Sequence, residues 1–198
     1  MTLIVKIVKL NWLRIYSTNI SMRIFIMEKV FSLIVDNTSG VLSRISGLFS
    51  RRGYNIESIT AGVTADPRFT RITIVTTGDD DILEQIEKQV EKLVDVRNIT
   101  ELVPDSSVYR ELALIKIECK PEERPNIISI TDTDAFKANV VDISKNGMII
   151  EMTATSAKID SFLELMSSYK ILEIARTGIA GLRRGTDNIF WPDKNNIE

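Results

Sequence analysis

The chain has 198 residues, of which 44% are hydrophobic, with a formal net charge of −2, one cysteine and no histidine. A charge this close to neutral excludes a strong global field toward nucleic acid or anionic lipid. The lack of histidine excludes a Ser-His-Asp triad, a Cys-His pair and any histidine-containing zinc site within the chain. The single Cys119 fits a reducing cytosol. We therefore expect a cytoplasmic protein with no nucleic-acid or membrane partner, containing one large or two small domains.

Residues 1–26 differ from the rest because they contain four basic residues and no acidic one. Lys6 and Lys9 interrupt the apolar run, which is too short and too charged to span a membrane. A targeting segment has a similar composition and remains an alternative. We expect an extension outside the folded domains, with the natural start at Met27.

Residues 27–102 predict six elements in the order strand, helix, strand, strand, helix, strand. Apolar residues alternate in the expected strands and recur every three to four residues in the expected helices. Gly53 ends the first helix, because glycine tolerates a left-handed backbone. The expected ranges are strand 29–36, a helix from Val41 to Gly53, strands 56–64 and 69–77 joined by a turn at 65–68, helix 79–93 and strand 94–102.

This order is that of a ferredoxin-like domain, with two helices on one face of a four-stranded antiparallel sheet. The other face or an edge of such a sheet needs a cover, and a second copy of the chain is the simplest one. A linker is predicted at 103–110, where Pro104 interrupts the pattern.

The same order of elements recurs over 111–185, followed by a polar tail at 186–198. The expected elements are strand 111–119, an ambiguous helix within 122–136, a hairpin over 139–154, a helix over 156–169 with Ser156 as its cap, and strand 171–179. The sequence therefore predicts an α+β protein with two ferredoxin-like (βαββαβ) domains.

The segment between the first strand and the first helix is the strongest candidate site. The backbone amides of Gly40, Val41 and Leu42 lack partners from a preceding turn and lie at the positive end of the helix dipole. They can hold a carboxylate, while Asn37 orients a charged group and Leu42 contacts an apolar side chain, as an amino acid requires. The alternative is an ordinary helix capped by Ser39, which is the commoner arrangement on spacing alone.

Other motifs carry weaker signals. The arginine pairs at 51–52 and 183–184 lack a glycine-rich phosphate cradle, so a solvated surface explains them. The acidic run at 79–81 suits a helix N-terminus better than a metal site. The strands lack the stacking aromatic motif of RNA-recognition domains, and "DNTSG" lacks the arginine of an acylphosphatase loop.

The stretch "LIVDNTSGVLSRISGLFSRRGYNIESIT" resembles the ACT domain of the small regulatory subunit of acetohydroxyacid synthase (acetolactate synthase). The resemblance continues through "DDDILEQIEKQVEKLVDV" and "RELALIKI" to "EIARTGIAGLRRG", and so covers roughly 27–185. The sequence departs from the family pattern in the extension 1–26 and in "KPEERPNIISITDTDAF", which places the interface with the large subunit in doubt.

The resemblance implies a regulatory subunit without catalytic residues or cofactors of its own. In this family the large catalytic subunit carries thiamine diphosphate, magnesium and FAD, and condenses two pyruvates or pyruvate with 2-oxobutyrate. The small subunit activates this thiamine diphosphate-dependent transferase. It also confers feedback inhibition by valine, or another branched-chain amino acid, in valine, leucine and isoleucine biosynthesis.

The resemblance also implies a homodimer through the ACT domains at 27–102, with the effector at their interface. One protomer would contribute Asn37, Gly40, Val41 and Leu42, and its partner Tyr54, Asn55 and Ile56. Two other functions stay open: a free-standing amino-acid-binding ACT module that regulates another enzyme, and an enzyme of acylphosphatase type. The missing histidine and loop arginine count against the enzyme.

Overall fold

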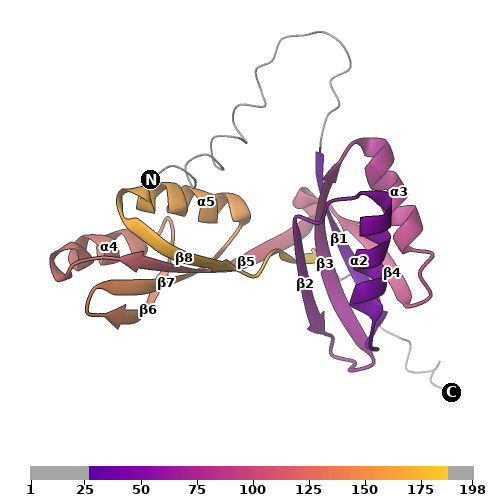
Figure 1. Ribbon diagram of the computed structural model, residues 1–198, viewed down its shortest axis with the longest axis horizontal. Coiled ribbons are helices and arrows are strands. Elements are labelled where there is room, and N and C mark those ends of the chain that lie inside the picture. Colours follow the sequence, from indigo (N-terminus) through magenta and orange to yellow (C-terminus); the bar gives the residue numbers. More distant parts are fainter. Residues whose placement is uncertain (1–26, 187–198) are drawn as a thin grey trace, which may run out of the picture.

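Two antiparallel sheets, each covered by two helices, make up the computed structural model, which describes residues 27–186. The expected extension at 1–26 and all but the first residue of the expected tail lie outside the described residues. One long strand, β5, runs from one sheet unit into the other (Figure 1). The predicted α+β class with two similar units is confirmed.

The N-terminal unit has the predicted order of elements. Its sheet has strand order β2-β3-β1-β4, and every neighbouring pair is antiparallel. Both helices lie on one face of the sheet (Figure 1), and we call the opposite face the open face. The elements are β1 (Met27–Asp36), α2 (Val41–Arg52), β2 (Ser58–Val63), β3 (Phe69–Gly78), α3 (Asp80–Val90) and β4 (Val96–Leu102).

Helix periodicity explains how this unit buries its core. Val41, Ile45 and Phe49 of α2 are fully or nearly fully buried, because their spacing places them on one side of the helix. They pack with Leu33 and Ile72 from the two central strands in one cluster. Full burial of such a side chain contributes about 1.5–3 kcal/mol, so the cluster holds both helices on the sheet.

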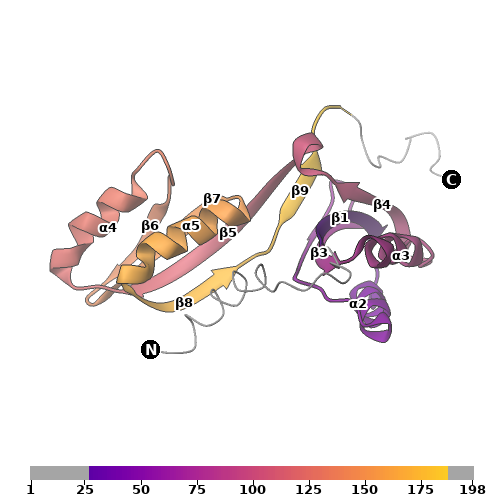
Figure 2. The ribbon, with the colours of Figure 1, turned by 90° about the horizontal axis from the view of Figure 1, so that it is seen from above.

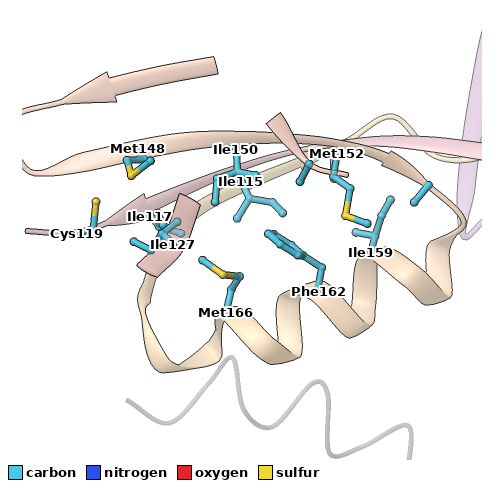
Figure 3. Close-up of a cluster of buried hydrophobic side chains, with 13 residues drawn as sticks. Ile115, Ile117, Cys119, Ile127, Met148, Ile150, Met152, Ile159, Phe162 and Met166 are labelled. Atoms are coloured by element: carbon cyan, nitrogen blue, oxygen red, sulfur yellow. The ribbon is translucent and has the colours of Figure 1, made fainter. Parts of the chain in front are cut away.

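The C-terminal unit repeats the arrangement around the sheet order β6-β7-β5-β8. Ile159, Phe162 and Met166 point from α5 and the turn after it toward Ile115 and Met152 of the sheet (Figure 3). Its elements are β5 (Ser107–Glu118), α4 (Arg124–Thr131), β6 (Asn139–Ser144), β7 (Gly147–Ala154), α5 (Ser156–Leu165), β8 (Lys170–Arg176) and β9 (Ala180–Arg183), with short 3-10 turns at Pro104–Ser106, Pro121–Glu123 and Met166–Ser168.

Two local predictions in this unit are corrected. Helix α4 ends at Thr131, well before the predicted limit of 136. The side-chain hydroxyl of Thr131 donates to the Ile128 carbonyl at 2.9 Å. Such local side-chain bonds compete with the backbone bonds that would continue the helix. The cap of α5 is Thr155, without a side-chain cap bond, and the Ser156 hydroxyl instead donates to the Glu111 carboxylate at 3.0 Å.

The predicted linker at 103–110 is strand in its second half. Residues 107–110 are the beginning of β5, and they pair with β9 through Ser107–Arg183 and Arg110–Ala180. We call this two-stranded element, residues 107–110 with 180–183, the β5/β9 ribbon. Its two strands are about 70 residues apart in sequence, so no local pattern reveals the pairing.

The ribbon packs on the open face of the N-terminal sheet, so the last described strand returns to the first unit (Figure 2). Ile179 joins Val30, Val75 and Leu102 in a small buried cluster, with Tyr109 packed against it. The Tyr109 hydroxyl donates to the Leu102 carbonyl. The ribbon therefore covers the side of the open face that β1 and β4 form.

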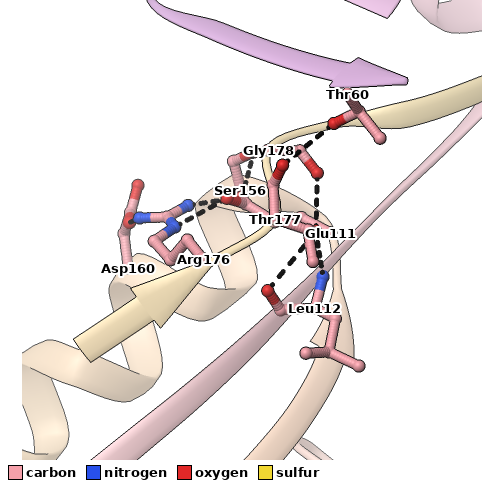
Figure 4. Close-up of polar contacts among 8 residues, drawn as sticks. All are labelled: Thr60, Glu111, Leu112, Ser156, Asp160, Arg176, Thr177 and Gly178. Atoms are coloured by element: carbon pink, nitrogen blue, oxygen red, sulfur yellow. Dashed lines mark hydrogen bonds and ion pairs between the residues drawn. The ribbon is translucent and has the colours of Figure 1, made fainter. Parts of the chain in front are cut away.

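A buried ion pair lies where the ribbon ends and the C-terminal sheet begins. Glu111 is 5% exposed and accepts two hydrogen bonds from Arg176, at 2.8 and 2.6 Å (Figure 4). Burial raises the pKa of Glu111, but the hydrogen bonds from Arg176 and Ser156 outweigh it, and the pKa lies below its usual value. Arg176 also donates to Asp160 of α5 at 2.7 Å. The network thus ties α5 to the edge strand β8.

Among the described residues, no helix is both long enough and apolar enough to cross a membrane.

We expect Glu111→Gln to lower the free energy of unfolding by about 2–3 kcal/mol at neutral pH. This is less than the roughly 3–5 kcal/mol typical of a broken buried pair, because Arg176 keeps Asp160. Since the folded pKa of Glu111 is lowered, its contribution exists above the unfolded pKa and is lost as the pH falls through the folded pKa. Urea titrations of both proteins should therefore converge in acid.

The matched control is Glu173→Gln, which breaks an exposed pair with Lys116. Stability should hardly change, since exposed pairs contribute little. Equal effects of the two substitutions would refute the structural role assigned to Glu111.

Candidate functional site

The start of α2 presents backbone donors without a side-chain cap. Gly40 is the N-cap residue, with φ of 85°, and no side chain caps the helix. The alternative of an ordinary helix capped by Ser39 is therefore wrong. The first bond within the helix runs from the Arg44 amide to the Gly40 carbonyl, at 3.0 Å, so the amides before Arg44 face outward. Helix α3 differs, because the Asp79 carboxylate accepts from the Ile82 amide at 2.8 Å.

A positive side chain lies beside this helix start. The Arg44 guanidinium makes two hydrogen bonds to Asp95, at 2.5 and 2.8 Å, and these bonds hold the pKa of Asp95 below its usual value. A Cβ added to Gly40 would lie 3.0 Å from Nη1 of Arg44, so this nitrogen is next to the uncapped amides. The uncapped amides and the helix dipole favour an anion here, while Asp95 balances the charge of Arg44.

Asn37 is exposed and fixes the loop before the helix. Its side-chain amide donates to the Pro67 carbonyl at 2.8 Å and accepts from the Thr70 hydroxyl at 3.1 Å. A primary amide has a second N–H and a second lone pair, so each end of the group keeps capacity for a ligand.

The next two predicted site residues face opposite ways. Val41 is 4% exposed and belongs to the core, so only its backbone amide is available to a ligand. Leu42 is 48% exposed and offers apolar surface beside the helix start.

The second group of predicted residues follows α2. Tyr54 packs edge-on against Phe49, with ring centroids 6.0 Å apart, and Ile56 is half-buried against the same core. Asn55 is exposed and donates to the Glu57 carboxylate at 2.6 Å. Of these predicted residues, Asn55 is therefore the one whose side chain is fully presented to solvent.

The two groups lie at opposite ends of the sheet. Asp36, next to Asn37, pairs with Phe69 at the start of β3, whereas Ser58, just after Asn55, pairs with Val75 near the end of β3. Six to seven residues of extended strand separate the two ends, which is about 20 Å. A single chain therefore does not bring the predicted site residues together.

The remaining candidates are surface or capping residues. Arg51 and Arg52 are exposed at the end of α2, where Arg52 bonds to Gln89. Asp79 caps α3, and the described residues contain no cluster of histidine, cysteine and acidic side chains that could hold a metal ion.

Sequence reasoning missed a cavity of about 630 Å³ between the open face and the β5/β9 ribbon. Half-buried Arg71 of β3 lines it. The available signal was a charged residue within the otherwise apolar and hydroxylated strand "FTRITIVTT".

Comparisons with known proteins identify the family of both units. Residues 31–98 match the family model "AHAS small subunit-like ACT domain", and residues 110–185 match "Small subunit of acetolactate synthase". The chain is 43% identical over 159 residues to the probable acetolactate synthase small subunit of Archaeoglobus fulgidus, covering 80% of this chain and 98% of that protein. It is also 43% identical over 160 residues to the acetolactate synthase isozyme 3 small subunit of Escherichia coli, covering 80% and 97%.

A solved structure, the acetolactate synthase small subunit from Thermotoga maritima, superimposes with a TM-score of 0.73 at 39% identity, covering 81% of this chain and 99% of that one. The similarity spans both sheet units and nearly the whole length of each relative. The chain therefore belongs to the family of acetolactate synthase small subunits, with an ACT domain as its N-terminal unit.

Proposed function

We propose that this chain is the regulatory subunit that activates the large catalytic subunit of acetolactate synthase and confers feedback inhibition by valine or another branched-chain amino acid. The observation that carries the proposal is the uncapped start of α2, with Arg44 beside it, at one end of an edge-exposed ACT sheet. Cofactors and catalysis belong to the large subunit in this proposal.

The effector site is completed by a second copy of the chain. Strand β2 forms an edge of the ACT sheet and runs parallel to β1, because both are antiparallel to β3. When the β2 edges of two chains pair antiparallel, the partner's Asn55 comes to the end of the sheet at which β1 ends and Asn37 lies. The same pairing joins two four-stranded sheets into one of eight strands and protects both edges.

Each part of a branched-chain amino acid has a counterpart in this site. The carboxylate binds the amides that begin α2, at the positive end of the helix dipole. Amide oxygens of Asn37 and of the partner's Asn55 accept from the ammonium group. The apolar side chain contacts Leu42, which is half-exposed.

Strand β2 also provides a route from the effector to the C-terminal unit. The Thr60 hydroxyl donates to the Thr177 carbonyl at 2.9 Å, across the junction (Figure 4). Gly178, with φ of 80°, lies so close that an added Cβ would be 2.9 Å from Cβ of Ser58. Residue 177 directly follows Arg176 of the buried ion pair. A shift of β2 on effector binding thus acts on residues that anchor the C-terminal unit, which we propose signals to the large subunit.

Gly40→Asp and Asn55→Ala should make the reconstituted enzyme resistant to valine. The aspartate repels the effector carboxylate and satisfies the helix start itself. The loss of one hydrogen bond in Asn55→Ala, about 0.5–1.5 kcal/mol, corresponds to a roughly 2- to 12-fold higher half-inhibitory concentration. Activation of the large subunit should persist in both variants.

The control for backbone strain is Gly185→Asp after β9, where φ is 87° and an added Cβ meets nothing within 4 Å. A left-handed non-glycine residue costs about 1–2 kcal/mol at either position. Gly185→Asp should keep valine sensitivity. Unchanged half-inhibitory concentrations in both site variants would remove the proposed site. Valine binding without any effect on acetolactate synthase would instead indicate an ACT module that serves another enzyme.

Cysteine cross-linking tests the dimer. A chain carrying Asn37→Cys and Asn55→Cys should form covalent dimers with a short bismaleimide, because the antiparallel pairing brings position 37 next to the partner's position 55. The native Cys119 is buried and does not compete.

The comparison pair is Asn37→Cys with Glu91→Cys, which places the second thiol at the exposed end of α3. Dimers should be scarce with this pair and with either single substitution. A monomer in sedimentation at micromolar concentration, or equal cross-linking of both pairs, contradicts pairing through β2.

Thr60→Val should uncouple effector binding from inhibition. The substitution removes the hydroxyl that donates to Thr177 and keeps the side-chain shape. Calorimetry should find valine affinity within a few-fold of wild type, while maximal inhibition of the reconstituted enzyme falls. Thr100→Val on the far edge strand is the matched control, since its hydroxyl bonds locally to Asn98. Full inhibition by the Thr60 variant would exclude this route.

A further inference from the structure

The cavity between the ACT sheet and the β5/β9 ribbon has the features of a second binding site. Its volume is about 630 Å³, and residues of β2, β3 and the ribbon line it. Apolar side chains line it from both the sheet and the ribbon: Val63, Phe69, Val108 and Leu182. Leu182 and Val63 are 56% and 60% exposed, so apolar surface is available inside the cavity.

A half-buried cation lies in this cavity, and no carboxylate among residues 27–186 pairs with it. Arg71 donates to the Ser32 hydroxyl at 2.8 Å and, in the part of the chain that the structure describes, pairs with no carboxylate. Burial lowers the pKa of its guanidinium, although arginine stays charged at neutral pH. Gly62 lies opposite Arg71 on β2 and has no side chain to cover it. Removing a charge from water without an opposite charge beside it costs free energy. An anion that pairs with Arg71 therefore binds with a favourable free energy.

Hydroxyl groups extend this polar floor. Thr60, Thr73 and Ser32 lie side by side on three neighbouring strands. Thr60 and Thr73 line the cavity, and Ser32 is the hydrogen-bond partner of Arg71. The Thr60 hydroxyl already donates to the Thr177 carbonyl, so an anion bound to Arg71 meets the hydroxyls of Ser32 and Thr73.

The other charged residues that line the cavity leave its net charge positive. Asp66 is the acidic residue among its lining residues, and its carboxylate is held by Arg68 in several hydrogen bonds, one of 2.6 Å. Those bonds lower the pKa of Asp66. Arg110 adds a second cation at the rim. Because Asp66 is already paired with Arg68, the described lining residues offer no unpaired carboxylate to an ammonium group.

We propose that this cavity is a binding site for a small organic anion with a short apolar body and no ammonium group, distinct from the ACT effector site. Its carboxylate pairs with Arg71, and its apolar part packs between β2 and β3 and the ribbon residues Val108 and Leu182. The inference does not depend on the identity of the effector. A ligand here touches both the sheet and the ribbon, so it stabilises their packing.

Calorimetric titration of the full chain with 3-methylbutanoate tests the proposal. This probe has a carboxylate and a branched apolar tail, and lacks the ammonium group that the effector site recognises. Wild type should bind it, and Arg71→Gln should bind at least about tenfold more weakly, as expected for loss of one charge-assisted pair. Arg71→Lys should retain part of the affinity, because it keeps the charge but not the planar donor geometry.

Two controls separate this site from the effector site. The neutral isostere 3-methylbutan-1-ol should not bind measurably, and Gly40→Asp should leave affinity for 3-methylbutanoate unchanged. Thermal melts of each variant show whether it is folded, and the Arg71→Lys arm stays informative if Arg71→Gln unfolds. No binding to wild type, equal affinity in Arg71→Gln, or loss of binding in Gly40→Asp would overturn the proposal.

Discussion

The contact that the rest of the structure depends on is the packing of the β5/β9 ribbon against the open face of the N-terminal sheet. Ile179, which directly precedes the ribbon, and Tyr109 pack against Leu102 and its neighbours. Position 181 needs a glycine, because an added Cβ would lie only 2.7 Å from the Leu102 side chain and clash with it. Burial of this apolar surface joins the two units without a flexible linker between the sheets. It also sets the position of Thr177 and Gly178 against β2, and it closes one side of the cavity at Arg71.

This contact makes β2 the element that several structural features share. One edge of β2 pairs with β3, and no strand within residues 27–186 pairs with its other edge. Its open-face side contacts the segment that follows β8, and the same strand lines the cavity. A perturbation at one of these places therefore acts on the others through a single short strand of six residues. Such a shared element is the physical requirement for coupling between distant sites.

Local patterns predicted most elements but not their ends. The spacing of Val41, Ile45 and Phe49 identified α2, because helix periodicity is written in neighbouring residues. The alternative cap at Ser39 does not form, because the left-handed Gly40 is the N-cap residue, and the loop before it is held by Asn37, which donates to Pro67 of the 65–68 turn. The predicted site residues Asn37, Gly40, Leu42 and Asn55 lie at the surface as expected, whereas Val41 belongs to the core.

By itself the sequence determined the α+β class, the two similar units and the resemblance to acetolactate synthase small subunits, because these rest on periodicity and on short motifs. Only the tertiary structure decided that residues 107–110 form a ribbon with 180–183, that Arg71 lines a cavity, and that Asn37 and Asn55 lie at opposite ends of one sheet. The physical reason is common to all three. Strand pairing and burial join residues that are distant along the chain, and the cost and gain of such contacts depend on the whole packed arrangement, which no local window of sequence contains.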